Sequence, residues 1–193
     1  MKISSVCVYC GSSDRVDEAF KDSAKRIGTE LAKRKLRVIF GGGHVGLMGI
    51  LSDAAINAGA EVVGIIPEHL RYQEVENKRV SELHIVPDMH SRKRMMVDAA
   101  DAFIVLPGGF GTLDEAFEIL TWKKLKLHVE PVILFNQNGY WDPMIALINR
   151  LIEEGFAEAA DLSLFDVVED VDSLLALLDG EKLLGQSSLT GRM

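Results

Sequence analysis

Residues 107–115 read Pro-Gly-Gly-Phe-Gly-Thr-Leu-Asp-Glu and follow directly on the apolar run 102–106. This order predicts a buried strand that ends in a glycine turn and continues at once into a helix. Glycines let the backbone approach a ligand closely, and the N–H groups at the positive end of a helix dipole favour a phosphate. The candidate phosphate-binding residues are Gly108, Gly109, Phe110, Gly111 and Thr112.

Glu115 adds a carboxylate one turn inside this predicted helix, beside the place where a sugar attached to the phosphate would lie. The same residue also has a purely structural interpretation. Residues 112–115 match a capping box, in which Thr112 caps the helix and Glu115 reaches back to the N–H of the cap. Capping of this kind stabilises a helix by about 0.5–2 kcal/mol. The local sequence leaves both interpretations open.

A basic cluster, His-Ser-Arg-Lys-Arg at residues 90–94, interrupts an otherwise acidic chain at the predicted start of another helix. Cations at a helix N-terminus oppose the helix dipole, and an unfavourable local choice suggests a compensating ligand or carboxylate. A guanidinium such as that of Arg92 can hold a phosphate or carboxylate through two hydrogen bonds. The structural alternative is an ordinary solvated charged face.

Strand-like and helix-like segments alternate along the whole chain, which is typical of a parallel sheet covered by helices on both faces. We therefore expect a doubly wound, mostly parallel, Rossmann-like α/β fold that forms a single domain over residues 1–180, with a loosely ordered tail over 181–193. The predicted strands cover 5–9, 37–40, 61–66, 83–86, 102–106, 131–135 and 165–168. The predicted helices cover 16–35, 45–58, 91–100, 113–125, 143–154 and 171–178, and the polar stretch 68–81 is expected to be a loop.

Three glycine-containing turns, at residues 10–13, 41–49 and 107–112, follow strands and so fall on the carboxyl edge of this sheet. Together they predict a nucleotide-sized groove. No Gly-Lys-Ser/Thr follows any of them, which argues against triphosphate hydrolysis. The best glycine pattern comes after later strands, whereas a dinucleotide fingerprint follows the first strand, so hydride transfer with a bound dinucleotide is disfavoured.

The composition narrows the class of protein further. The 193 residues carry a net charge of −8, which disfavours binding to nucleic acid because a polyanion would be repelled. Cys7 and Cys10 are too few for a four-ligand zinc site and are expected to be reduced and structural. The five histidines show no metal-binding spacing, and no apolar run approaches the roughly 20 residues that span a bilayer. We expect a cytoplasmic protein with no metal, no cofactor and no membrane partner.

The chain resembles the Lonely guy family of phosphoribohydrolases. The motifs that carry the resemblance are Gly-Gly-Gly and Gly-Leu-Met-Gly within 41–49, Met-His-Ser-Arg-Lys at 89–93, and the stretch 107–115, and the match runs from about residue 6 to 151. It implies hydrolysis of the N-glycosidic bond of cytokinin riboside 5′-monophosphates, and of AMP, to release the free base and ribose 5-phosphate. Such sequences have often been labelled lysine decarboxylases, but this chain is short for a pyridoxal-phosphate enzyme.

The resemblance also implies roles for individual residues. Arg92 and Glu115 fall on the catalytic positions of the family, while Glu74, Lys93, residues 108–112 and Thr121 fall on its substrate-contacting positions. Phe110 stands where a tyrosine is common, Asp114 where a glutamate is common, and the segment 72–79 differs more. The family is usually dimeric, with the site near the subunit interface. The alternative function is a non-catalytic, nucleotide- or cofactor-binding carrier, which would have no need for Arg92 and Glu115.

Overall fold

The computed structural model describes residues 3–72 and 75–181. Its centre is a seven-stranded sheet with the order β4-β3-β2-β1-β5-β6-β7, and every neighbouring pair of strands is parallel. The strands are β1 (Ser5–Tyr9), β2 (Arg37–Phe40), β3 (Val62–Pro67), β4 (Glu82–Val86), β5 (Ala102–Val105), β6 (Val132–Phe135) and β7 (Asp166–Val168). The predicted doubly wound α/β fold is confirmed.

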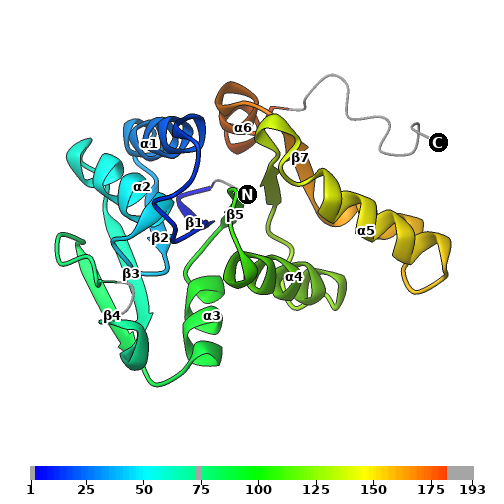
Figure 1. Ribbon diagram of the computed structural model, residues 1–193, viewed down its shortest axis with the longest axis horizontal. Coiled ribbons are helices and arrows are strands. Elements are labelled where there is room, and N and C mark those ends of the chain that lie inside the picture. Colours follow the sequence, from blue (N-terminus) through cyan, green and yellow to red (C-terminus); the bar gives the residue numbers. More distant parts are fainter. Residues whose placement is uncertain (1–2, 73–74, 182–193) are drawn as a thin grey trace.

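Helices cover both faces of the sheet (Figure 1). One face carries α1 (Glu18–Lys33), α2 (Gly46–Asn57) and α6 (Val171–Leu178), and the other carries α3 (Met89–Asp98), α4 (Phe110–Lys124) and α5 (Asp142–Glu153). Within β1, Val6 and Val8 pack into the first core, whereas Cys7 and Tyr9 pack into the second. This alternation follows from the two-residue period of a strand, and it explains why residues 6–9 of β1 are buried on both faces of the sheet.

The strands follow the apolar runs of the sequence closely. The bounds of β1, β2 and α6 are those predicted, and the other strands agree to within one residue at each end. In the polar stretch 68–81 the described residues contain one short helix, η1 (Glu68–Leu70), and are otherwise irregular, as expected. Two further short helices, η2 (Gln137–Gly139) and η3 (Ala159–Leu164), were not predicted.

The two helices that matter most for the site begin earlier than the sequence pattern predicts. Helix α4 begins at Phe110 and has Gly109 as its N-cap. Helix α3 begins at Met89, because the carboxylate of Asp88 accepts a hydrogen bond from the N–H of Ser91 at 2.7 Å and caps the helix. That backbone hydrogen bond also lowers the pKa of Asp88. A negative charge at the N-cap offsets the unfavourable placement of the basic cluster.

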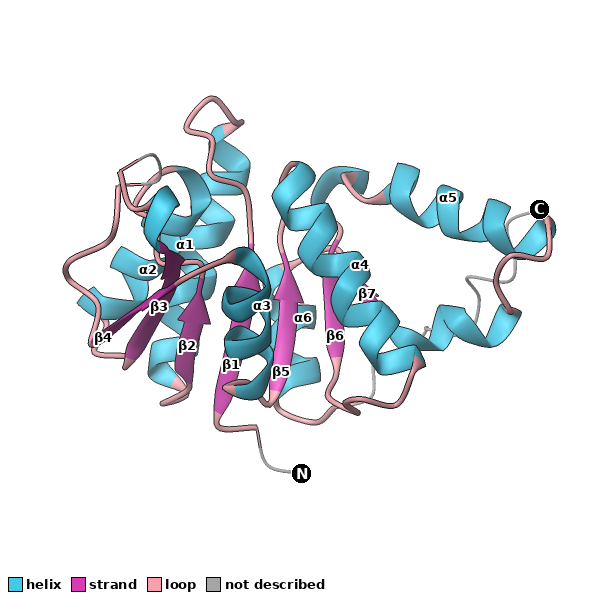
Figure 2. Ribbon diagram, turned by 90° about the horizontal axis from the view of Figure 1, so that it is seen from below, coloured by secondary structure: helices cyan, strands magenta, loops and turns pink. Residues whose placement is uncertain are grey.

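The carboxyl ends of β1 and β5 lie where the winding of the sheet reverses (Figure 2). The chain adds β2, β3 and β4 on one side of β1 and then returns to place β5, β6 and β7 on the other. Ligands of doubly wound sheets bind at such a switch point. The glycine turns meet there: the N–H of Gly11 donates to Pro107 O and the N–H of Leu47 donates to Gly11 O, each at 3.0 Å.

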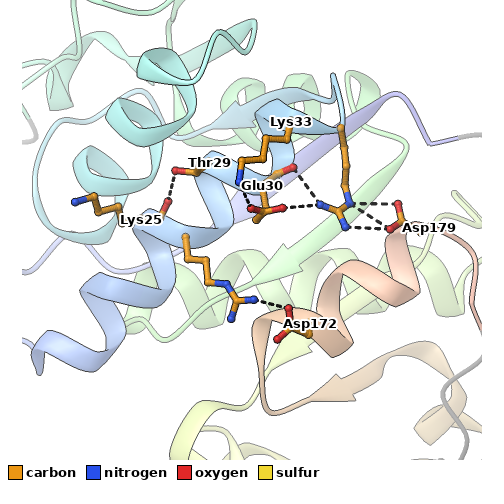
Figure 3. Close-up of polar contacts among 8 residues, drawn as sticks. Lys25, Thr29, Glu30, Lys33, Asp172 and Asp179 are labelled. Atoms are coloured by element: carbon orange, nitrogen blue, oxygen red, sulfur yellow. Dashed lines mark hydrogen bonds and ion pairs between the residues drawn. The ribbon is translucent and has the colours of Figure 1, made fainter.

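Ion pairs join the first and last helices on one face of the sheet (Figure 3). Arg34 lies between Glu30 of its own helix, at 2.9 Å, and Asp179 just beyond α6, at 3.1 Å. Arg26 of α1 pairs with Asp172 of α6. The pairs with Asp172 and Asp179 connect residues more than 140 positions apart and so fasten the end of the described chain to α1.

Two absences hold for residues 3–72 and 75–181. No helix in these ranges has the length and apolar character needed to cross a membrane. No group of three or more acidic, histidine or cysteine side chains in them could hold a metal ion. Glu74 and nearly all of the predicted loose tail lie outside the described residues.

Candidate active site

A cavity of about 150 Å³ opens at the switch point of the sheet. Its walls come from the end of β1 and the turn after it, the glycine turn after β2, and the first turns of α2, α3 and α4. Arg92 and Glu115 both line this cavity, as do residues 109–112. The structure therefore brings residues of all three glycine turns and these two charged side chains to one cavity.

The N-terminus of α4 forms one wall. Gly109 caps the helix without a side-chain hydrogen bond, and the first helical bond runs from the N–H of Leu113 to Gly109 O. The N–H groups of Phe110, Gly111 and Thr112 precede that bond, at the positive end of the helix dipole. Such a position favours an anion. Among these residues Thr112 is buried, whereas the side chain of Phe110 is exposed at the rim.

Gly108 lets the glycine turn pack closely against Thr112 in the first turn of α4. A Cβ atom on Gly108 would overlap the Oγ1 atom of Thr112, so this position has no room for a side chain. The Gly108 carbonyl accepts a hydrogen bond of 2.7 Å from the hydroxyl of Tyr140. Gly108 therefore packs against Thr112 and Tyr140 and does not line the cavity, whereas residues 109–112 do.

The capping-box interpretation of Glu115 is wrong. Because α4 begins at Phe110 with Gly109 as its cap, Thr112 is the third residue of the helix and Glu115 the sixth. Glu115 thus lies beyond the first turn, where it cannot return to the N-cap in the manner of a capping box. Its side chain is only 8% exposed and lines the cavity.

Arg92 enters the cavity from α3. The residue is 5% exposed, which contradicts the alternative of a solvated charged face. Its Nη2 atom donates a hydrogen bond of 3.3 Å to the carbonyl of Gly41, and its Nη1 atom lies 3.7 Å from Sδ of Met89. The buried Nε–H has no hydrogen-bond partner among the described residues. A buried, unpaired donor costs folding free energy, so this guanidinium is held in the cavity wall at some expense of stability.

Arg92 and Glu115 form the charged centre of the cavity. Nη2 of Arg92 lies 3.7 Å from Oε1 of Glu115, which is an ion pair longer than a direct hydrogen bond. Both side chains are more than nine-tenths buried, so their charges interact more strongly than a surface pair would. The arrangement offers a carboxylate and a guanidinium, side by side, to a small polar molecule.

Comparisons with known proteins decide the family. A family model described as "Possible lysine decarboxylase" matches residues 48–178. The chain is 44% identical over 155 residues to the cytokinin riboside 5′-monophosphate phosphoribohydrolase LOG1 of Arabidopsis thaliana, covering 80% of this chain and 73% of that protein. It is 43% identical to LOG3 of the same plant, again over 155 residues, covering 80% and 72%. The chain belongs to the Lonely guy family.

Solved structures agree on the fold of this Lonely guy protein. The molybdenum cofactor carrier protein of Chlamydomonas reinhardtii superposes with a TM-score of 0.70 at 19% identity, covering 91% of this chain and 96% of the carrier. At that identity the likeness shows a shared fold only. The predicted membership of the Lonely guy family is confirmed by the sequence relatives.

Two residues implied by the Lonely guy resemblance, Lys93 and Thr121, lie outside the cavity of a single chain. Nζ of Lys93 lies 3.0 Å from Asp114 and 3.1 Å from Glu118. Burial alone would lower the pKa of Lys93, but its hydrogen bonds to these two carboxylates outweigh burial and raise the pKa. Thr121 lies on the outer side of α4, and its hydroxyl donates to Phe117 O at 2.7 Å.

The third such residue, Glu74, lies outside the described residues, but its loop is attached next to the cavity. The carbonyl of Val75 accepts a hydrogen bond of 2.8 Å from the N–H of His44. The N–H of Asn77 donates to Gly42 O at 2.9 Å, and Gly43 forms an isolated antiparallel bridge with Glu76. The described end of the loop therefore runs along the glycine turn that lines the cavity.

Sequence reasoning missed two residues of the cavity wall, Val8 and Tyr9, whereas Cys10 and Met48 lie within glycine turns that it assigned to the groove. Burial raises the pKa of Tyr9 well above its usual value, and burial likewise raises the pKa of the Cys7 thiol beside it. These groups therefore stay protonated at neutral pH. A signal for Tyr9 existed, because the last residue of a central strand in a doubly wound sheet faces the ligand edge.

Proposed function

We propose that this protein hydrolyses the N-glycosidic bond of cytokinin riboside 5′-monophosphates, and of AMP, to release the free base and ribose 5-phosphate. The observation that carries the proposal is the convergence of Arg92 and Glu115, 3.7 Å apart and buried, beside the N-terminus of α4. The names of the Lonely guy relatives supply the reaction class. The described residues supply the groups that such a reaction needs.

Binding begins with the 5′-phosphate on the N–H groups of residues 110–112. Glu115 follows these residues by three to five positions, which at 1.5 Å per residue is roughly 5–8 Å along the helix axis. That interval corresponds to the length of a ribose between its 5′-phosphate and its anomeric carbon. One helix thus carries both the anchor and the carboxylate, and phosphate binding positions the bond to be broken.

Chemistry then takes place at the anomeric carbon. As the bond to the base breaks, its electron pair leaves with the base nitrogen and the ribose becomes oxocarbenium-like. A carboxylate stabilises that cation and orients or deprotonates the attacking water, as it does in glycosidases. We assign this role to Glu115. The water oxygen bonds to the anomeric carbon, and the proton it gives up balances the proton that the departing base takes.

Arg92 holds the carboxylate of Glu115 and the substrate in the relative positions that the reaction needs. Its Nη2 atom faces Glu115, and the residue lines the cavity in which the ribose and the departing base would lie. A fixed guanidinium stabilises negative charge in a water-poor cavity far better than in solvent. We assign it to fixing the ribose and to stabilising charge as the base leaves.

The test is chromatography of products after incubation with AMP and with an isopentenylated AMP. Glu115→Gln and Arg92→Ala should each abolish base release and remain folded. Matched controls are Glu153→Gln and Arg150→Ala, which make the same changes in an exposed ion pair on α5 and should leave turnover unchanged. The unphosphorylated nucleosides should react more slowly by about 100-fold or more, because they lack the anchoring group. Near-normal turnover by either cavity variant would overturn the assignment.

The carrier alternative predicts a different result in the same experiment. A carrier would bind the nucleotide with measurable affinity and return it unchanged, and Glu115→Gln would have little effect on that binding. Base release by the unaltered protein excludes this alternative directly.

We further propose a cytoplasmic homodimer with the active site near its interface. The outer side of α4 carries a shallow surface hollow lined by Phe117, Glu118, Thr121 and Trp122, next to the buried Lys93. A partner chain on this face would bring its Lys93 and Thr121 toward the neighbouring cavity. Thr121→Arg should then give a monomer with much reduced activity and unchanged circular dichroism. A Thr121→Arg protein that is still dimeric and fully active would contradict this arrangement.

A further inference from the structure

Gly41 is in direct contact with the guanidinium of Arg92. It follows the last residue of β2, is buried, and its carbonyl accepts the 3.3 Å hydrogen bond from Nη2. Met89 offers the same guanidinium only a weak sulfur acceptor, at 3.7 Å, so the carbonyl makes the stronger of these two contacts. Gly41 therefore fixes the Nη2 end of the guanidinium, which is also the end that faces Glu115.

The absence of a side chain at this position has a spatial cause. The φ angle of Gly41 lies outside the left-handed region, unlike that of the next residue, Gly42, so the backbone there would accept any residue. A Cβ atom, however, would overlap Nη2 of Arg92 and lie 3.0 Å from its Cζ. The next nearest atom is Sδ of Met48, at 3.3 Å. The space that a methyl group would need is the space that Arg92 occupies.

The carbonyl of Gly41 is itself held in place. The turn that follows it is attached to the 75–77 segment through the hydrogen bonds of Gly42 and His44, and a Cβ atom on Gly42 would lie 3.0 Å from Cβ of Ile66. A close-packed backbone of this kind has little freedom to move aside. The cost of a methyl group on Gly41 must therefore fall on the guanidinium.

We propose that Gly41 is a positioning residue for Arg92. Its carbonyl and its missing side chain together set the guanidinium at its 3.7 Å distance from Glu115. Displacement of the guanidinium by about 1 Å is expected to reduce turnover by about 100-fold, since catalytic groups tolerate little misplacement. The activity part of this proposal rests on the proposed hydrolase function, whereas the contact between Gly41 and Arg92 does not.

The decisive variant is Gly41→Ala, studied alone and in the Arg92→Ala background. Alone, it should lower kcat for AMP by about 100-fold and leave KM within about threefold, because residues 109–112 bind the phosphate elsewhere in the cavity. It should also lower Tm by several degrees. In the Arg92→Ala background the overlap is gone, so the same substitution should leave Tm unchanged.

Gly41→Ala in a Met48→Ala background is the matched comparison. The Met48→Ala background removes the other atom near a Cβ on Gly41 and keeps Arg92. Gly41→Ala should therefore still lower kcat and Tm in this background. Should Gly41→Ala alone fail to fold, recovery of a folded protein by adding Arg92→Ala supports the proposal. Two results would overturn it: wild-type kcat in Gly41→Ala, or a loss of Tm that persists with Arg92→Ala. If the protein proves not to be a hydrolase, the Tm comparison still decides whether Gly41 positions Arg92.

Discussion

The buried pair of Arg92 and Glu115 should show strong energetic coupling in unfolding experiments. The perturbation is Arg92→Met, which keeps the length of the side chain and removes its charge, together with Glu115→Gln, which keeps the shape and removes the other charge. Each single variant leaves one buried charge without its counter-charge. The double variant leaves neither, so it should be less destabilised than the sum of the two single changes.

The magnitude follows from the geometry. At the Nη2–Oε1 distance of 3.7 Å, the Coulomb energy at an effective dielectric constant of 20 is about 4 kcal/mol. The cavity is open to water on one side, which screens the pair, so we expect a coupling energy of about 1–3 kcal/mol. Each single variant should lose about 2–4 kcal/mol of unfolding free energy. These losses are smaller than the typical stability of a domain, about 5–15 kcal/mol, so the variants should remain folded.

The assay is equilibrium unfolding in urea at pH 7, followed by circular dichroism. All four proteins are compared at one protein concentration, because self-association would otherwise contribute differently to each. If the loss of unfolding free energy in the double variant equals the sum of the two single losses to within about 0.5 kcal/mol, the two charges do not interact. That result would refute the close pairing on which the active site is built.

Three further perturbations test other parts of the structure. Asp101→Asn removes a carboxylate whose Oδ2 accepts four hydrogen bonds of 2.6–2.9 Å from Ser4 and Ser5. The Ser4 hydroxyl is the main cause of the lowered pKa of Asp101, so the carboxylate stabilises the fold above pH of about 4 and loses that effect as the pH falls through its folded pKa. The variant should be less stable by about 1–2 kcal/mol at pH 7, and the difference should vanish in acid. Asn77→Ala removes a buried amide that donates to Ser52 at 3.0 Å, and should cost about 1–3 kcal/mol by the same measurement. Gly108→Ala should raise the KM for AMP by about tenfold or more because the new methyl group displaces Thr112, whereas an unchanged KM would show that this turn does not set the phosphate site.

Much of the fold could be predicted because its signals are local. Short apolar runs such as 6–9 and 38–40 are typical of strands buried on both faces, and β1 and β2 have the predicted bounds. The order of strands and glycines along the chain is enough to place the glycine turns at one edge of the sheet, since the carboxyl ends of parallel strands lie together. The cavity at the switch point is a direct consequence of that topology.

The local sequence pattern led to a wrong helix cap and could not predict the different partners of neighbouring basic residues in the site. Thr112 and Glu115 match a capping box in sequence, yet Gly109 caps the helix and moves Glu115 into the sixth position. Lys93 and Arg92 are neighbours in the same basic run, but a helix turns by about 100° per residue, so the two side chains meet different partners.

Contacts distant in sequence were beyond prediction from the residues alone. The hydrogen bond between Arg92 and Gly41 joins residues 51 positions apart, and nothing in the type of either residue predicts this contact. The sequence marks Gly41 only as part of a turn. Its contact with the guanidinium exists because the turn after β2 and the first turn of α3 line the same cavity, which is a property of the assembled sheet.

The most direct test of this account is a crystal structure of the Glu115→Gln protein with AMP bound. Phosphate oxygens should lie within about 3 Å of the amide nitrogens of residues 110–112, and the anomeric carbon should lie between the side chains at positions 92 and 115. A phosphate bound elsewhere, or an anomeric carbon remote from both side chains, would contradict the central claim.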